Sequence, residues 1–207
     1  MDDLSLFDHV TLDHHVPRTL FLLPGTGGDK NDLLFFDQLL NSAFTIISLT
    51  GNVREQGMPR FFDRIGPGVF DQDSITQETE KLQRFVKQSI KEYSISLDQV
   101  SFLGYSNGAN MILALALRYP QLVPRAALLH SMLPFPITKS VDLSNHQFLV
   151  TMGSADTMIP PDQQHAVVTA LQSQQAQVTV KEYPCGHEVS DWEIHDAVAF
   201  LLQTPVN

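Results

Sequence analysis

Short apolar runs alternate with helical segments along most of the chain, and this pattern predicts the fold class. Each run is only four to seven residues long, whereas the segments between the runs repeat their apolar positions at helical spacing. Apolar strands separated by helices are typical of an α/β protein whose mostly parallel central sheet is covered by helices on both faces. The runs expected as strands are residues 19–23, 44–49, 100–103, 125–130, 146–152 and 177–183.

The expected helices lie between these runs, at residues 31–40, 74–93, 109–117, 161–173 and 187–203. Ser74 followed by Gln77 predicts a capping box at the start of the second helix. Pro160 and Pro161 are expected to open the fourth helix, and His187 to begin the last. Residues 8–16 are expected to add an antiparallel strand at one edge of the sheet.

Composition and charge narrow the classes of function. The 207 residues suffice for one domain, which we expect to span 1–207. The net charge of -10 argues against a nucleic-acid partner and offers no basic patch for an anionic membrane. Cys185, the only cysteine, excludes an internal disulfide, and the acidic start Met1 to Ser5 does not resemble a signal peptide. We therefore expect a cytoplasmic protein without stable membrane insertion, as a monomer or homodimer.

The sequence Gly104-Tyr105-Ser106-Asn107-Gly108 fits the G-x-S-x-G pattern of a nucleophile elbow. The pattern alone is weak, but here an apolar run precedes it and a helix-forming stretch follows it. A sharp strand-to-helix turn would expose Ser106, and the flanking glycines would avoid a clash between strand and helix. Ser106 is therefore the candidate nucleophile.

A serine nucleophile needs a histidine base and a carboxylate that orients this base. Asp156 follows the fifth apolar run and His187 follows the sixth, which gives the chain order Ser106, Asp156, His187 of α/β-hydrolases. Two other aspartates fit the carboxylate role less well, because Asp142 precedes the fifth run and Asp162 suits the first turn of a helix. The competing histidines, His165 and His195, both fall inside expected helices.

An oxyanion site needs backbone N–H donors beside the nucleophile. The residue after the nucleophile, Asn107, is one expected donor. The Gly-rich loop at residues 23–28 follows the first long apolar run, and its Thr26 is the other expected donor.

These motifs together resemble a small bacterial α/β-hydrolase of the carboxylesterase/phospholipase group, similar to acyl-protein thioesterases and dienelactone hydrolases. The resemblance covers residues 19–202 and implies serine esterase chemistry on an ester or thioester. Pro24-Gly25 stands where thioesterases usually have His-Gly, and Ser106 stands where dienelactone hydrolases have cysteine. The first departure predicts a differently shaped oxyanion loop, and the second argues against dienelactone hydrolysis.

The long loop at residues 50–73 is the expected wall of a substrate pocket, because it leaves the carboxyl end of a strand. We expect its aromatic residues to form an acyl or aromatic pocket, and an arginine to orient a substrate carboxylate or to anchor the loop on Asp63 or Asp71. A loop stabilised by its own small core is the alternative. The segment 131–145 is too short for a separate lid domain, so we expect an open, shallow groove. The pocket candidates are Met58, Arg60, Phe61, Phe62, Arg64, Leu133 and Phe135, and the role of Arg54 stays open.

The expected function is a serine carboxylesterase that hydrolyses small to medium acyl esters and uses no cofactor or metal. His9, His14 and His15 lack recognisable metal-ligand spacing and are expected on the surface. A lysophospholipase or acyl-thioesterase is the alternative among enzymes. A ligand-binding relative without catalysis is the alternative from another class.

Overall fold

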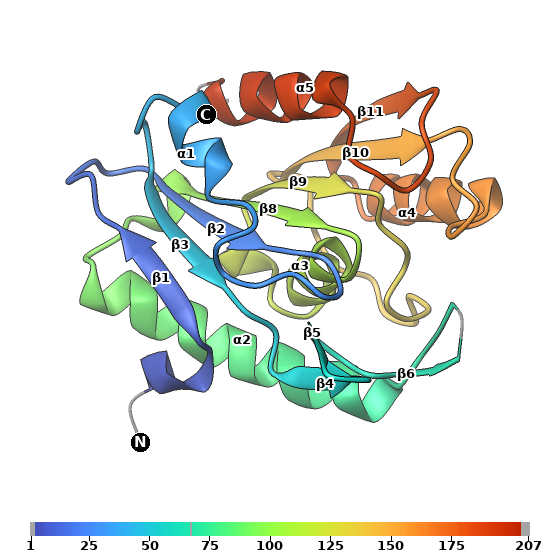
Figure 1. Ribbon diagram of the computed structural model, residues 1–207, viewed down its shortest axis with the longest axis horizontal. Coiled ribbons are helices and arrows are strands. Elements are labelled where there is room, and N and C mark those ends of the chain that lie inside the picture. Colours follow the sequence, from blue (N-terminus) through green and yellow to red (C-terminus); the bar gives the residue numbers. More distant parts are fainter. Residues whose placement is uncertain (1–2, 67, 204–207) are drawn as a thin grey trace.

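The apolar runs form one seven-stranded sheet in the computed structural model, which describes residues 3–66 and 68–203. The strand order is β1-β3-β2-β8-β9-β10-β11 (Figure 1). β1 pairs antiparallel with β3, and the other strands are parallel. The mostly parallel sheet and the antiparallel edge strand are thus confirmed. The strands of the sheet are β1 (His9–Leu12), β2 (Thr19–Leu23), β3 (Thr45–Leu49), β8 (Val100–Tyr105), β9 (Arg125–Leu129), β10 (Gln147–Gly153) and β11 (Gln177–Tyr183).

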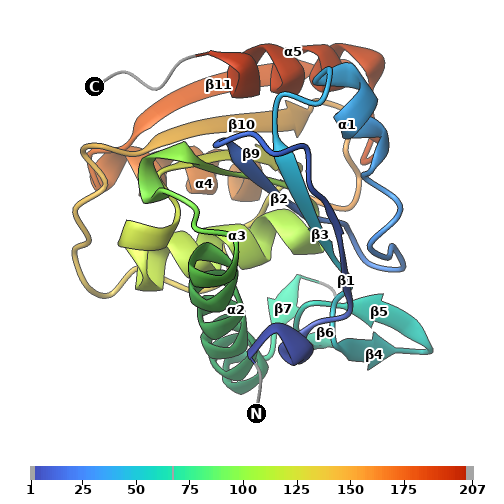
Figure 2. The ribbon, with the colours of Figure 1, turned by 90° about the vertical axis from the view of Figure 1, so that its left-hand side faces the viewer.

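Helices cover both faces of the sheet, with α1 and α5 on one face and α2, α3 and α4 on the other (Figure 2). Alternate residues of each strand serve the two layers: Leu20 and Leu22 pack with α1 and α5, whereas Phe21 and Leu23 pack with the other three helices. The helices are α1 (Phe35–Leu39), α2 (Gln72–Glu92), α3 (Asn107–Arg118), α4 (Pro161–Ser173) and α5 (Asp191–Leu202); short 3₁₀ turns occupy Asp3–Leu6, Leu97–Gln99 and Pro120–Leu122.

The caps of α2 and α5 differ from the predictions. Asp71, not Ser74, caps α2, because its carboxylate accepts hydrogen bonds from the backbone N–H groups of Asp73 and Ser74. The last helix begins at Asp191 rather than at His187, because Ser190 and Glu193 form a complete capping box. His187 therefore lies in the preceding loop.

The first predicted helix is also shorter than expected, since only Phe35–Leu39 is α-helical. The carboxylate of Asp29 accepts a hydrogen bond from the backbone of Asn31, and that of Asp32 accepts one from the backbone of Asp29. Such local bonds compete with helix formation.

The loop at residues 50–73 contains two small hairpins. β4 (Val53–Glu55) pairs with β5 (Met58–Arg60), and β6 (Arg64–Gly66) pairs with β7 (Val69–Phe70). In contrast, residues 130–146, between β9 and β10, form neither helix nor strand. Of these two segments, the one with the hairpins is therefore the larger insertion beyond the carboxyl ends of the strands.

The strand order reverses beside β2, because β3 lies on one side of β2 and β8 lies on the other. Leu23 at the end of β2 is in register with Gly104 of β8. Ligands of open α/β sheets bind beyond the carboxyl ends of the strands at such a reversal. Both the Gly-rich loop and the elbow leave the sheet at this point.

Candidate active site

Ser106 occupies a sharp turn between β8 and α3, as the motif predicts. Its backbone has φ 51° and ψ -115°, a conformation that is strained for a residue with a side chain. A Cβ atom added to Gly108 would lie 2.0 Å from the carbonyl oxygen of Leu23, and one added to Gly104 would lie 2.7 Å from the nitrogen of Ala109. The two glycines therefore allow strand and helix to meet closely enough to form the turn.

The structure brings Ser106, His187 and Asp156 together from three separate loops. Nε2 of His187 lies 2.9 Å from Oγ of Ser106, and Nδ1 of His187 lies 2.8 Å from Oδ2 of Asp156. The side chain of Asp156 is fully buried, whereas that of His187 is 14% exposed. This chain of contacts has the geometry in which a carboxylate orients a histidine beside a hydroxyl.

Backbone and side-chain donors fix the carboxylate of Asp156. Its Oδ1 accepts hydrogen bonds from the backbone N–H groups of Met158 (2.8 Å) and Ile159 (2.9 Å). Burial alone would raise the pKa of Asp156, but hydrogen bonds from His187, Ile159 and His130 outweigh it and lower the pKa. Asp156 is therefore ionised at neutral pH.

Tyr105, the first variable residue of the motif, also supports the loop of His187. Its hydroxyl donates a hydrogen bond of 2.7 Å to the backbone carbonyl of His187. Burial, followed by the charges of Asp156, Glu193 and Glu188, raises the pKa of Tyr105 to about 12. The hydroxyl therefore stays protonated and remains a donor.

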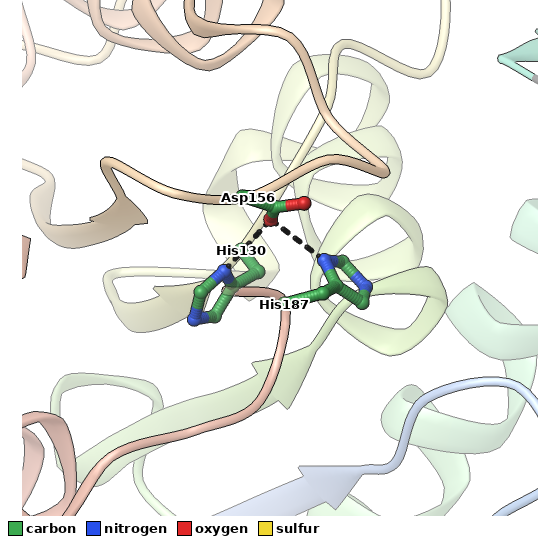
Figure 3. Close-up of side chains that lie close together, drawn as sticks. All are labelled: His130, Asp156 and His187. Carbon is green, nitrogen blue, oxygen red and sulfur yellow. Dashed lines mark hydrogen bonds and ion pairs between the residues drawn. The ribbon is translucent and has the colours of Figure 1, made fainter. Parts of the chain in front are cut away.

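His130 is a member of this cluster that the sequence did not reveal. The sequence pattern placed it inside a strand, but β9 ends at Leu129 and His130 adopts a positive φ of 50°. Its Nδ1 lies 3.1 Å from Oδ2 of Asp156, the same oxygen that faces His187 (Figure 3). Its Nε2 lies 3.0 Å from Oε1 of Glu193. A histidine directly after a strand at the carboxyl edge of the sheet was the available signal.

The Gly-rich loop lies directly against Ser106. A Cβ added to Gly25 would lie 3.4 Å from Cβ of Ser106, so the neighbouring Thr26 is near the elbow. Asn107 is the first residue of α3, and N–H groups of the first turn have no acceptor within the helix. Gly27 N donates to the carbonyl of Pro59 at 2.9 Å, which joins this loop to β5.

The side chain of Asn107 has a structural contact that the motif did not predict. Its Oδ1 accepts a hydrogen bond of 2.7 Å from the backbone N–H of Phe61. Asn110 makes the equivalent contact on another loop, because its Oδ1 accepts from the backbone N–H of Met132 at 2.7 Å. The start of α3 therefore anchors both segments that were expected to wall the site.

The arginines of the hairpin loop bind a partner other than those expected. Nη1 of Arg60 and Nε of Arg64 each lie 2.7 Å from a different carboxylate oxygen of Glu55. The expected anchors, Asp63 and Asp71, make no ion pair with these two arginines in the part of the chain that the structure describes. Glu55 therefore crosslinks the two hairpins, and this replaces the predicted anchoring.

Two of the three aromatic side chains expected in the pocket are buried instead. Phe61 is 1% exposed and Phe62 is 0% exposed, and both belong to the main hydrophobic core. The ring of Phe62 packs edge-on against Phe70, with centroids 5.1 Å apart. The two rings therefore anchor the loop to the main core of the protein, which is neither the expected pocket nor a separate small core of the loop. Met58 is 42% exposed, and its sulfur would lie 3.6 Å from a Cβ added to Gly27, so it remains beside the site.

Leu133 and Phe135 border cavities that do not include Ser106. The guanidinium of Arg118 lies 4.8 Å from the ring centroid of Phe135, at the end of α3 opposite Ser106. Phe135 lines a cavity of about 670 Å³ there, and Leu133 lines one of about 380 Å³ beside α4. These two cavities lie away from Ser106, and the position of Leu133 and Phe135 in a pocket around Ser106 stays a prediction.

Two groups of side chains have donor atoms close enough together to hold a metal ion, namely His130, Asp156 and His187, and His130, Cys185 and Glu193. In the first group, a cation would displace the contacts of both histidines to Asp156. In the second, Cys185 Sγ donates to Oε2 of Glu193 at 3.6 Å, and burial followed by Glu193 raises the pKa of this thiol to about 11. A protonated thiol is a poor metal ligand, so these atoms suit hydrogen bonding among themselves.

Comparison with protein-family models matches residues 18–204 to the phospholipase/carboxylesterase model. The chain belongs to this family. The resemblance stated from the motifs is thereby confirmed, and the match spans the elbow, the Gly-rich loop and the segments of Asp156 and His187.

Individual relatives agree with the family and the fold. MhqD of Bacillus subtilis (strain 168) is 29% identical over 180 residues, which are 87% of this chain and 90% of MhqD. The Bacillus cereus carboxylesterase is 30% identical, with a TM-score of 0.89 over 97% of this chain and 98% of that one. A carboxylesterase from Mesorhizobium loti is 31% identical, with a TM-score of 0.89 over 95% and 94% of the two chains. The α/β-hydrolase fold is therefore confirmed, and the family supports a hydrolase.

Across residues 3–66 and 68–203, no helix combines the length and the apolar character needed to cross a bilayer.

Proposed function

We propose that the protein is a serine carboxylesterase that hydrolyses small to medium acyl esters through Ser106, His187 and Asp156. The observation that carries the proposal is the position of His187, whose two ring nitrogens lie 2.9 Å from Ser106 Oγ and 2.8 Å from Asp156 Oδ2. Because the carboxylate accepts a hydrogen bond from Nδ1–H, Nε2 carries no proton and can accept that of the serine. The match to the phospholipase/carboxylesterase family supports ester substrates.

The geometry supports a reaction in two halves. His187 removes the proton of Ser106, whose oxygen attacks the ester carbonyl, and the resulting imidazolium then protonates the departing alkoxide. Water, activated by His187, next releases the acyl group from Ser106. No step needs a cofactor or a metal.

The backbone N–H groups of Thr26 and Asn107 are the proposed donors to the oxyanion. Asn107 offers a first-turn N–H of α3, and the same helix end directs its positive dipole toward Ser106. The closeness of Gly25 to Ser106, where an added Cβ would lie 3.4 Å from Cβ of Ser106, supports the position of Thr26. Removing one preorganised donor of this kind typically lowers kcat by about 10²–10³-fold.

The test is the hydrolysis of p-nitrophenyl acetate by the wild-type protein and by Ser106→Ala. We expect the variant to lose at least about 10⁴-fold in kcat, since removing a triad nucleophile has effects of this size or larger. Ser101→Ala is a matched control, because Ser101 is buried in β8 away from the elbow. Equal rates for Ser106→Ala and the wild type would overturn the proposal.

A panel of esters with graded acyl length distinguishes the proposed substrate class from a lipid substrate. We expect kcat/KM to be highest for short and medium acyl groups. A maximum at long acyl groups would favour a lysophospholipase or thioesterase instead.

A further inference from the structure

His130 lies between two carboxylates and is itself completely buried. Its Nδ1 is 3.1 Å from Asp156 Oδ2, and its Nε2 is 3.0 Å from Glu193 Oε1. The side chains of all three residues are 0% exposed. The contact to Glu193 is at ion-pair distance, although its direction is not that of a well-aligned hydrogen bond. Neither Nε2 nor Oε1 has another hydrogen-bond partner among the described residues.

The position of the two carboxylates defines the protonation of the ring. An ionised carboxylate can only accept hydrogen bonds, and a neutral imidazole has a proton on one nitrogen alone. A neutral His130 would therefore direct a lone pair at a carboxylate oxygen about 3 Å away, inside the core. With both carboxylates ionised, only the doubly protonated ring satisfies both neighbours.

The charges of the three residues agree with this geometry. Burial would lower the pKa of His130, but Glu193 and then Asp156 outweigh it and raise that pKa. Burial would likewise raise the pKa of Glu193, but His130 and the backbone of Ser190 outweigh it and lower the pKa. Both directions favour a cationic ring between two ionised carboxylates.

Neither carboxylate is free to turn away from His130. Oε2 of Glu193 accepts a hydrogen bond of 2.8 Å from the backbone N–H of Ser190, within the capping box of α5. Oδ1 of Asp156 is fixed by the backbone of Met158 and Ile159, as described above. His130 therefore connects the start of α5 to the carboxylate that faces His187.

Other titratable groups surround the ring on every side. The ring of His187 lies 5.3 Å from that of His130, and the ring of Tyr105 lies 6.0 Å from it. Cys185 contacts Glu193, and the charge of Glu188 is also near His130. His187 is the group of this set whose protonation would end the proposed catalysis.

We propose that His130 is a positioning residue, present as an imidazolium between Asp156 and Glu193, which orients Asp156 toward His187 and opposes the protonation of His187. This inference rests on the proposed function of Ser106, His187 and Asp156. The rings of His130 and His187 lie 5.3 Å apart, so a positive charge on His130 repels a second positive charge on His187.

The first experiment is the pH profile of kcat/KM for His130→Asn. Asparagine tolerates a positive φ, and its amide can still donate to Asp156, but the positive charge is lost. We expect the midpoint of the acid limb to rise by about one pH unit, a tenfold change in the fraction of active base at low pH. We also expect kcat to fall while KM changes little, because His130 does not contact the substrate site. His195→Asn on the exposed face of α5 is the matched control, with an unchanged profile.

The second variant, Glu193→Gln, keeps an oxygen acceptor for Ser190 but removes the carboxylate that requires a proton on Nε2 of His130. We expect the acid limb to move in the same direction by a smaller amount, because Glu193 loses its negative charge as His130 loses its positive one. Glu182→Gln makes the same change at an exposed position of β11 and serves as the control. If His130→Asn does not fold, the double variant His130→Asn/Glu193→Gln is measured instead. It lacks the buried carboxylate of Glu193 that His130→Asn alone would leave unpaired.

The third measurement is the ¹⁵N NMR spectrum of histidine-labelled protein at neutral pH. We expect both ring nitrogens of His130 to be protonated in the wild type and in Ser106→Ala, and one of them to be unprotonated in Glu193→Gln. A neutral His130 ring in the wild type, or folded variants whose acid limb does not move, would overturn the proposal. A change in stability alone, without a shift of the limb, also contradicts it.

These outcomes separate this proposal from the proposed function. If Ser106→Ala remains fully active, the proposed function fails, whereas the NMR spectrum still decides the protonation of His130. If Ser106→Ala is inactive and the acid limb of His130→Asn is unchanged, only the role of His130 fails.

Discussion

Replacing Gly108 by alanine should damage both the stability and the activity of the protein. The added Cβ would lie 2.0 Å from the carbonyl oxygen of Leu23 and 2.5 Å from that of Pro24. The first distance is about 1.4 Å short of the 3.4 Å at which ordinary contact begins. Both neighbours are backbone atoms, so α3 or the loop after β2 must move.

The expected magnitude follows from the required shift. Overpacking of a well-packed interior usually costs about 1–3 kcal/mol of unfolding free energy. A displacement of about 1 Å at a catalytic group can lower the rate about 10²-fold. Because the moved segment contains Thr26 or Ser106, we expect kcat of Gly108→Ala to fall by at least this factor.

The assay combines urea unfolding, followed by circular dichroism, with ester hydrolysis corrected for the folded fraction. Gly66→Ala is the matched control, since a Cβ there meets no atom of the described residues within 4 Å. We expect the control to behave as the wild type. Wild-type stability and kcat for Gly108→Ala would refute the close contact between strand and helix at the elbow.

Three further predictions concern Asp156, Glu55 and Phe62. Asp156→Asn keeps the oxygen that accepts hydrogen bonds from the backbone of Met158 and Ile159, but it favours the wrong tautomer of His187. We therefore expect kcat/KM in ester hydrolysis to fall by about 10⁴-fold, as in other serine triads. A loss below about tenfold would contradict the proposed role. Hydrogen bonding from Arg64 and then Arg60 lowers the pKa of Glu55, so its stabilising effect is present above the pKa of the unfolded chain and is lost as pH falls through the lower folded value. Glu55→Gln should therefore have a lower Tm than the wild type at neutral pH and the same Tm in strong acid, and a Tm difference that is independent of pH would refute this reasoning. Phe62→Ala should lower the unfolding free energy in urea by about 3 kcal/mol with little change in KM for a small ester, because the ring packs in the core; a raised KM at unchanged stability would instead place the ring in the substrate pocket.

The sequence pattern was sufficient for the central strands because buried parallel strands read as continuous apolar runs, whereas β11, at the edge of the sheet, is mostly exposed and mixes apolar with polar residues. β2 and β11 agree with their predicted residues, and the other strands of the sheet differ from theirs by a few residues at the ends. The helix starts were less predictable, since several polar residues can compete for one cap. At α2 both Asp71 and Ser74 qualify, and the structure uses Asp71 as the cap while the Ser74 hydroxyl accepts a hydrogen bond from Asp63.

The candidate site was likewise predictable only in part. Ser106, Asp156 and His187 were identifiable because their chain order and strand-end positions form a pattern. The contacts of His130 with Glu193, and of Glu55 with both arginines, join residues whose spacing has no motif. They depend on side-chain directions that only the packed structure defines. The burial of Phe61 and Phe62 was equally unpredictable from the sequence, because an aromatic residue in a loop can line a pocket or pack in a core.

Ser106 is the proposed nucleophile, and covalent labelling tests this role. A fluorophosphonate probe reacts with an activated serine, and mass spectrometry of the digested protein identifies the modified residue. We expect a single adduct on the peptide that contains Ser106, and no adduct in Ser106→Ala or after His187→Ala. An unlabelled wild-type protein, or an adduct on another serine that persists in Ser106→Ala, would contradict the account.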